Sequence, residues 1–167
     1  MRTVGVPHPR LPLPEAGQGD DLAAFQTWLE EAIPLLPHLG LEGMAWQDDT
    51  LVWELTLAPN LNDKGTGFGG SLNAQTTLIG WCWVTLWLRA RQRQQDVVVA
   101  EASQRFLAPV RGDYRLECCP QDRHAAATLA ERLDERGKGR ITLLQRLYCG
   151  KRLCLEACGD YAVLPEA

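Results

Sequence analysis

A polar, glycine-rich loop that leads into a long apolar helix is the segment of this sequence best suited to chemistry. It reads Pro-Asn-Leu-Asn-Asp-Lys-Gly-Thr-Gly-Phe-Gly-Gly over residues 59–70. The N–H groups at a helix start have no partner within the helix, and the helix end carries about half a positive charge. These amides can stabilise an oxyanion, such as the one formed when a carbonyl carbon is attacked. Gly69 and Gly70 would let a substrate approach them closely.

The glycine spacing also matches the dinucleotide-binding pattern G-x-G-x-x-G, through Gly65, Gly67 and Gly70. In nucleotide-binding folds this pattern directly follows a strand of a parallel sheet, and an acidic residue about 20 positions later ends the next strand. Here a polar loop precedes the glycines, and the corresponding position falls at the end of the predicted helix. The context therefore argues against nucleotide binding.

The cysteines, histidines and Ser71 predict neither a metal site nor a serine nucleophile. No C-x-x-C pair occurs, no histidine lies near a cysteine cluster, and none lies close in sequence to Ser71. Ser71 is better explained as a residue of the first helical turn. The cysteines are interpreted as small buried hydrophobic residues. They are Cys82, Cys118, Cys119, Cys149, Cys154 and Cys158, and the histidines are His8, His38 and His124.

The glycine loop is positioned by a helix predicted from about Ser71 to Arg91. Its first two turns are polar, whereas residues 78–88 are apolar on nearly every side, so this part must be enclosed. The apolar stretch is too short to span a bilayer, which takes about 20 residues. Gly80 costs about 1 kcal/mol relative to alanine inside a helix, which indicates close approach of backbone or ligand there. The aromatic residues Trp81, Trp83 and Trp87 are interpreted as core packing.

The remaining periodicity predicts an α+β fold, in which an antiparallel curved sheet wraps around one long central helix. Asp20 or Asp21 can cap an N-terminal helix that ends at Pro34, and a shorter helix is predicted over residues 125–136. Short turns between consecutive strands favour antiparallel pairing. The predicted strands cover residues 41–47, 51–58, 97–107, 113–119, 140–148 and 153–163.

The chain of 167 residues is predicted to form a single domain over residues 20–167. Residues 1–19 contain four prolines and no periodicity, and are expected to be a flexible or surface-draped leader. A net charge of -4 argues against a dedicated nucleic-acid binder. Without an apolar signal segment or a membrane span, a cytoplasmic, reducing location is expected.

The loop and helix start resemble a known family signature. The string Asn62-x-x-Gly65-Thr66-x-Phe68-Gly69-Gly70 resembles the N-x-x-G-T-x-H-G-G signature of hot-dog-fold acyl-thioesterases of the phenylacetate-pathway type. Residues 105–113 resemble a strand end of that superfamily, and residues 157–163 resemble its closing strand. With phenylalanine in place of histidine, residues 68–72 and the later Gly80-Trp81 are most similar to thioesterases related to the C-terminal domain of YiiD.

This resemblance implies a hot-dog fold that forms a homodimer or a dimer of dimers by joining sheets, with active sites at the dimer interface. The substrate would be an acyl thioester of coenzyme A or acyl carrier protein, and no cofactor is implied beyond the coenzyme A or phosphopantetheine of the substrate. Asn62 would orient the attacking water or the carbonyl, and the Gly69 amide would stabilise the oxyanion. The predicted substrate-binding residues are Phe68, Gly70, Ser71 and Thr77.

The sequence departs from the family pattern at the general base. Related enzymes have a loop histidine where this chain has Phe68, and a helix carboxylate where it has Thr77. Asp63, beside Asn62, and Glu101, on the following strand, are the candidate replacements. Asp63 is also typical of a turn, and Glu101 of an exposed strand position.

Three functions remain open on this basis. The first is hydrolysis of acyl-coenzyme A or acyl-carrier-protein thioesters in fatty acid metabolism. The second is decarboxylation of a malonyl-type thioester, which needs the oxyanion hole but no attacking water. The third is non-catalytic binding of acyl thioesters. Water activation near neutral pH usually requires a positioned base worth about 100- to 10,000-fold, so the missing carboxylate favours the second relative to a typical hydrolase of this family.

Overall fold

The computed structural model describes residues 1–167 as three α-helices and six β-strands, together with two short 3₁₀ helices. The antiparallel α+β architecture predicted from the sequence is confirmed. The helices are α1 (Leu22–Ala32), α2 (Gly69–Arg89) and α3 (Ala125–Arg136), with 3₁₀ helices η1 (Leu36–His38) and η2 (Ala58–Asn60). The strands are β1 (Leu41–Gln47), β2 (Thr50–Leu55), β3 (Val97–Phe106), β4 (Tyr114–Pro120), β5 (Gly139–Cys149) and β6 (Arg152–Val163).

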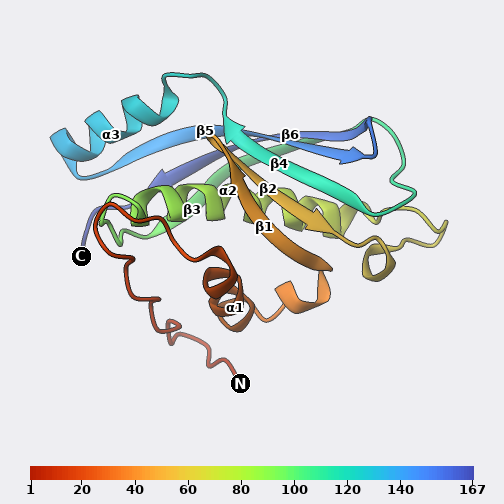
Figure 1. The fold of residues 1–167 in the computed structure, drawn as a ribbon, viewed down its shortest axis with the longest axis horizontal. Coiled ribbons are helices and arrows are strands. Elements are labelled where there is room, and N and C mark those ends of the chain that lie inside the picture. Colours follow the sequence, from red (N-terminus) through yellow and green to blue (C-terminus); the bar gives the residue numbers. More distant parts are fainter.

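The six strands form one antiparallel sheet in the order β1-β2-β4-β5-β6-β3. Strands β1 and β3 are therefore its edges. Figure 1 shows the sheet curving over α2, with α1 and the leader on the opposite side of α2. The apolar second half of the long helix thus lies between the sheet and α1, as its sequence requires.

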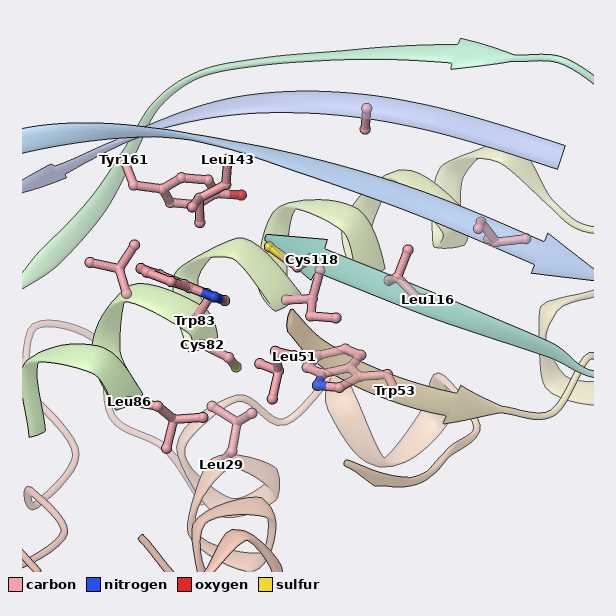
Figure 2. Close-up of a cluster of buried hydrophobic side chains, with 14 of the residues drawn as sticks. Leu29, Leu51, Trp53, Cys82, Trp83, Leu86, Leu116, Cys118, Leu143 and Tyr161 are labelled. Atoms are coloured by element: carbon pink, nitrogen blue, oxygen red, sulfur yellow. The ribbon is translucent and has the colours of Figure 1, made fainter. Parts of the chain in front are cut away.

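The core fills the space between α2 and the sheet. Figure 2 shows Cys82 and Trp83 of α2 beside Leu51, Cys118 and Tyr161 of the sheet. Burial raises the pKa of the Cys82 and Cys118 thiols, so both remain protonated hydrophobic residues. The predicted core role of Trp83 is confirmed, since 2% of the residue is exposed.

Gly80 lies where α2 touches the phenol of Tyr161, and a close approach at this glycine is confirmed. A Cβ atom at position 80 would clash with the hydroxyl oxygen of Tyr161. That hydroxyl donates a hydrogen bond of 2.8 Å to the backbone oxygen of Thr77. The missing side chain at position 80 therefore lets the tyrosine ring lie against the helix backbone.

Substitution Gly80→Ala is expected to lower the melting temperature, because the added methyl group must displace Tyr161 from a fully packed core. Overpacking of this kind costs about 1–3 kcal/mol, and more where backbone must shift. Thermal unfolding followed by circular dichroism measures the loss. Gly43→Ala is the matched control, since a Cβ there meets no atom within 4 Å. Equal melting temperatures for the two variants would contradict this account of Gly80.

An ion pair at the end of α2 holds the leader and the start of α1. The Arg89 and Asp20 side chains are 7% and 6% exposed, and Arg89 Nη2 lies 2.9 Å from Asp20 Oδ1. The guanidinium also donates to the backbone oxygens of Leu11 and Pro12, at 2.8 Å and 2.6 Å. We call these four residues the Arg89 clamp. Asp21 instead caps α1, because its carboxylate accepts the first backbone amides of that helix.

The leader follows the surface without forming a helix or strand. The Trp28 indole donates to the backbone oxygen of Pro9 at 2.9 Å, and Arg10 pairs with Asp96 at 2.9 Å. Gln92 donates to the backbone oxygen of Pro14 at 2.8 Å. Together with the Arg89 clamp, these contacts fix the leader against α1 and the end of α2.

Most predicted element boundaries agree with the structure, and β2 shows the largest difference. The strand ends at Leu55 instead of residue 58. The amide of Leu57 donates to the Asp113 carboxylate at 2.9 Å instead of to a neighbouring strand, and Pro59 has no amide to donate. Helix α2 starts at Gly69, two residues before the predicted Ser71, and α3 matches its predicted range. None of these helices combines the length and the apolar character needed to cross a membrane.

Candidate functional site

The glycine loop before α2 is held in shape by the side chain of Asn62. Its Nδ2 donates to Thr66 Oγ1 at 2.9 Å and to the backbone oxygen of Gly67 at 3.2 Å. Its Oδ1 accepts the backbone amides of Lys64 and Thr66 at 2.9 Å and 3.0 Å. Both ends of the amide therefore bond within the loop. The role of Asn62 in orienting water or a carbonyl stays a prediction, and its observed bonds position the loop.

Two further hydrogen bonds attach the end of the loop to neighbouring segments. The amide of Gly67 donates to Val110 O at 2.9 Å, and that of Phe68 donates to Asn60 O at 2.7 Å. Helix α2 begins at the next residue. Phe68, its N-cap residue, offers no side-chain acceptor. The amides of Gly69, Gly70 and Ser71 are consequently uncapped, in contrast to those at the start of α1.

Buried hydrogen bonds among Asn60, Gln75 and Tyr114 fix the start of the loop against α2. The Gln75 side chain donates to Asn60 Oδ1 at 3.0 Å and accepts from the Tyr114 hydroxyl at 2.7 Å. Asn60 in turn donates to the backbone oxygens of Leu39 and Thr56, each at 2.9 Å. Burial raises the pKa of Tyr114 to about 12, so its phenol remains a donor near neutral pH. These bonds hold the start of α2 in a fixed relation to the sheet.

Two hollows flank the uncapped amides. The first, which we call the helix groove, has a volume of about 500 Å³ and follows one face of α2 from Gly70 to Trp81. Its opposite wall is apolar and includes Ile33, Leu35 and Val99. The second hollow, of about 310 Å³, lies between Gly69 and the segment that follows β3. The start of α2 thus faces space on both sides.

The predicted substrate-binding residues occupy different positions around this start. Gly70 and Thr77 line the helix groove. The Phe68 ring packs over Gly70, where a Cβ would lie 2.7 Å from it, and is 53% exposed. The Ser71 hydroxyl donates to the backbone oxygen of Phe68 at 3.1 Å, as a residue of the first helical turn does. The catalytic candidate Gly69 lines the second hollow.

The two predicted carboxylates lie on the exposed loop and on β3. Asp63 is exposed in the loop, where it pairs with Lys64 at 3.0 Å. Glu101 lies opposite Asp160 in the β3–β6 register, and the buried neighbours Gly159 and Tyr161 face the core instead. Directly opposite residues share one face of an antiparallel pair, so Glu101 is turned away from α2. Neither carboxylate lines the two hollows, and the role of each as the base stays a prediction.

Asn73 and Trp81 line the helix groove. Asn73 was not predicted as a site residue, and Trp81, interpreted from the sequence as core packing, is only partly buried. Both lie on the face of α2 that carries Gly70 and Thr77, at the three- and four-residue spacing of a helix. The sequence alone therefore shows that these residues share one face of the helix. The sequence does not show which face of the helix stays open, because that depends on how far β3 and α1 extend over it.

Residues 22–165 match the family model described as "Putative thioesterase (yiiD_Cterm)". A protein of unknown function from Chlorobaculum tepidum is 28% identical with a TM-score of 0.78, over 86% of this chain and 94% of that one. A putative thioesterase from Shewanella oneidensis is also 28% identical, with a TM-score of 0.76, over 86% and 97%.

A thioesterase from Haemophilus influenzae shares the fold at 17% identity and a TM-score of 0.70, over 90% of this chain and 94% of that one. These likenesses and the strand order confirm the hot-dog fold predicted from the sequence.

Proposed function

The chain belongs to the thioesterase family related to the C-terminal domain of YiiD, and from this premise we propose that it hydrolyses acyl thioesters at the start of α2. One observation carries the proposal: the uncapped amides of Gly69, Gly70 and Ser71 lie beside an apolar groove. Helix-start amides attract an oxyanion, and an apolar groove suits an acyl chain.

In the proposed reaction, water attacks the thioester carbonyl carbon and the carbonyl oxygen becomes an oxyanion held by these amides. The carbon–sulfur bond then breaks, so the thiol leaves and a carboxylic acid remains. We propose coenzyme A or the phosphopantetheine of acyl carrier protein as the thiol, in fatty acid metabolism. The thioester carbonyl would lie at the uncapped amides of the helix start, with its acyl chain in the helix groove beside Thr77.

The proposed assembly is a homodimer joined through β3. This edge strand has no neighbour on one side and exposes Val98, Val99 and Phe106. An unpaired apolar edge is stabilised by pairing with a second copy. Val99 lines the helix groove, so a second copy at β3 would also complete the groove wall. Light scattering at micromolar concentration should give at least twice the chain mass of 18.6 kDa, and a mass of one chain would exclude the dimer.

A second candidate function is decarboxylation of a malonyl thioester. The observation that favours it is the absence of any carboxylate among the residues lining the two hollows. Enolate stabilisation needs the same amides but no base. Octanoyl-coenzyme A and malonyl-coenzyme A should be assayed in parallel for thiol release and carbon dioxide. Thiol release from octanoyl-coenzyme A supports hydrolysis, carbon dioxide from malonyl-coenzyme A supports decarboxylation, and binding without either product indicates a non-catalytic module.

Substitution Thr77→Asp is expected to accelerate thioester hydrolysis. Thr77 lines the helix groove and occupies the position at which related hydrolases have a carboxylate, which could then activate water. A positioned base contributes about 100-fold or more near neutral pH. The measurement is kcat for octanoyl-coenzyme A, with Thr77→Asn as the uncharged control of similar size. An unchanged kcat in both variants would show that water is activated elsewhere.

A further inference from the structure

Beyond the helix groove, the same face of α2 borders another cavity, which we call the leader cavity. This leader cavity has a volume of about 430 Å³ and lies between the leader, α1 and the last turns of α2. Ile33 and Trp81 line both the helix groove and the leader cavity. The two spaces are therefore neighbours along one helix, separated at Trp81. Leader-cavity residues include His8 and Leu11 from the leader, Trp28 from α1, and Thr85 and Leu88 from α2.

The Trp81 side chain is fixed where the two spaces meet. Its indole Nε1 donates to the backbone oxygen of Val97 at 2.9 Å. This bond ties the ring, which projects from α2, to the first residue of β3. The residue is only half-buried, so part of its surface faces the groove and the cavity. The Trp81 side chain therefore lies between the helix groove and the leader cavity.

The helix groove has the length of a medium acyl chain. Trp81 lies eleven positions after Gly70, which corresponds to about 16 Å at 1.5 Å per residue of helix. A chain whose carbonyl lies at the uncapped amides would run beside Thr77 and Leu78 and end at the indole. The walls along this path are mainly apolar, as an acyl chain requires.

The leader cavity is lined by both apolar and charged side chains. Its apolar walls come from Leu11, Trp28 and Leu88. Its charged lining includes Arg10 and Arg89, whose guanidinium groups pair with carboxylates of Asp96 and Asp20. The boundary shared with the helix groove is formed by Ile33 and Trp81, so a tail that enters from the groove would pass these two side chains.

We propose that Trp81 sets the acyl chain length of the substrate. The helix groove accepts a medium-length acyl chain, which spans the distance of about 16 Å along α2. The leader cavity receives the tail of a longer chain only when the indole is removed. This inference rests on the proposed thioester hydrolysis and deepens it by naming the substrate class as medium-chain acyl thioesters.

The test compares kcat/KM for butyryl-, octanoyl-, dodecanoyl- and hexadecanoyl-coenzyme A between the unmodified protein and Trp81→Ala. The unmodified protein should prefer octanoyl or dodecanoyl substrates. Trp81→Ala should raise the hexadecanoyl-to-octanoyl ratio at least about tenfold, because each methylene moved from water to an apolar wall contributes about fourfold. Trp81→Leu provides a milder opening if the alanine variant fails to fold. An unchanged ratio in the folded variants would overturn the proposal.

Two further variants locate the effect. Trp46→Ala removes a tryptophan of β1 that lines neither space, and its chain-length preference should equal that of the unmodified protein. Trp81→Ala combined with Thr85→Phe fills the leader cavity and should restore the medium-chain preference. A hexadecanoyl preference that survives in the double variant would show that the tail lies elsewhere.

Failure of the proposed function is distinguished by a binding measurement. Calorimetry with octanoate and hexadecanoate requires no turnover, and hexadecanoate should gain affinity in Trp81→Ala relative to octanoate. Absent hydrolysis with this gain would reject the hydrolase and retain the role of Trp81. Hydrolysis without any change in chain preference or binding would retain the hydrolase and reject the role of Trp81.

Discussion

Substitution Gly69→Pro is expected to lower kcat for thioester hydrolysis about 100- to 1,000-fold while the protein remains folded. The Gly69 amide is the first of α2 and donates no hydrogen bond within the chain. Proline removes this amide hydrogen and nothing else that the helix needs. Loss of one oxyanion donor typically costs this much in kcat, because the charge develops in the transition state.

The local backbone accommodates proline at this position. Proline is favoured as the first helical residue, and the preceding Phe68 has the extended conformation that proline requires, with φ -74° and ψ 118°. A Cβ at position 69 would lie 3.4 Å from the Phe106 ring, an ordinary contact. Gly69→Ala is therefore the matched control, since it adds a Cβ and keeps the amide hydrogen.

The measurement is kcat for octanoyl-coenzyme A, with melting temperatures for both variants. Alanine should retain most of the activity that proline loses. An equal loss in both variants would attribute the effect to the added carbon atoms, and an unchanged kcat in Gly69→Pro would remove this amide from the oxyanion hole.

Substitution Asp20→Ala is expected to lower the free energy of unfolding by about 3–5 kcal/mol. The change leaves the Arg89 guanidinium, 7% exposed, without its carboxylate partner. Breaking one side of a buried ion pair costs this much because the remaining charge is held away from water. Urea denaturation gives the free energy directly, and an unchanged slope would show that the unfolded state is not altered.

The neighbouring aspartate provides the control for this prediction. Asp21→Ala removes an N-cap from α1, which typically costs about 1 kcal/mol. Replacing the pair together, as Asp20→Leu with Arg89→Met, removes both buried charges and should recover most of the lost stability. If Asp20→Ala costs no more than Asp21→Ala, the Arg89 clamp contributes little.

The fold could be predicted well because its signals are local. Apolar character on every side of residues 78–88 implies an enclosed helix, and Gly137, with φ 69°, ends α3 at the predicted residue. The roles of Asp20 and Asp21 could not be separated in this way. Either residue can cap a helix, and the choice depends on Arg89, which lies 69 residues from Asp20.

The sheet face on which the candidate base Glu101 lies could not be predicted, for a different reason. Alternation along an unbroken strand would place Glu101 on the same face as Val99, toward α2. A β-bulge between these two residues inserts Ala100, and the extra residue reverses the alternation. Glu101 therefore faces outward beside Asp160. A bulge of this kind has no clear signal in the sequence Val-Val-Val-Ala-Glu, so the face of Glu101 could not be predicted.

The Arg89 clamp also bears on the kinetics of folding. Its hydrogen bonds join residues 69 to 78 positions apart, so they close long loops and form only after α2 and α1 have docked. Interactions that form after the transition state slow unfolding and leave the refolding rate nearly unchanged. The clamp therefore controls how long the leader and α1 stay attached to the folded molecule, and hence how rarely this end of α2 is exposed to proteases.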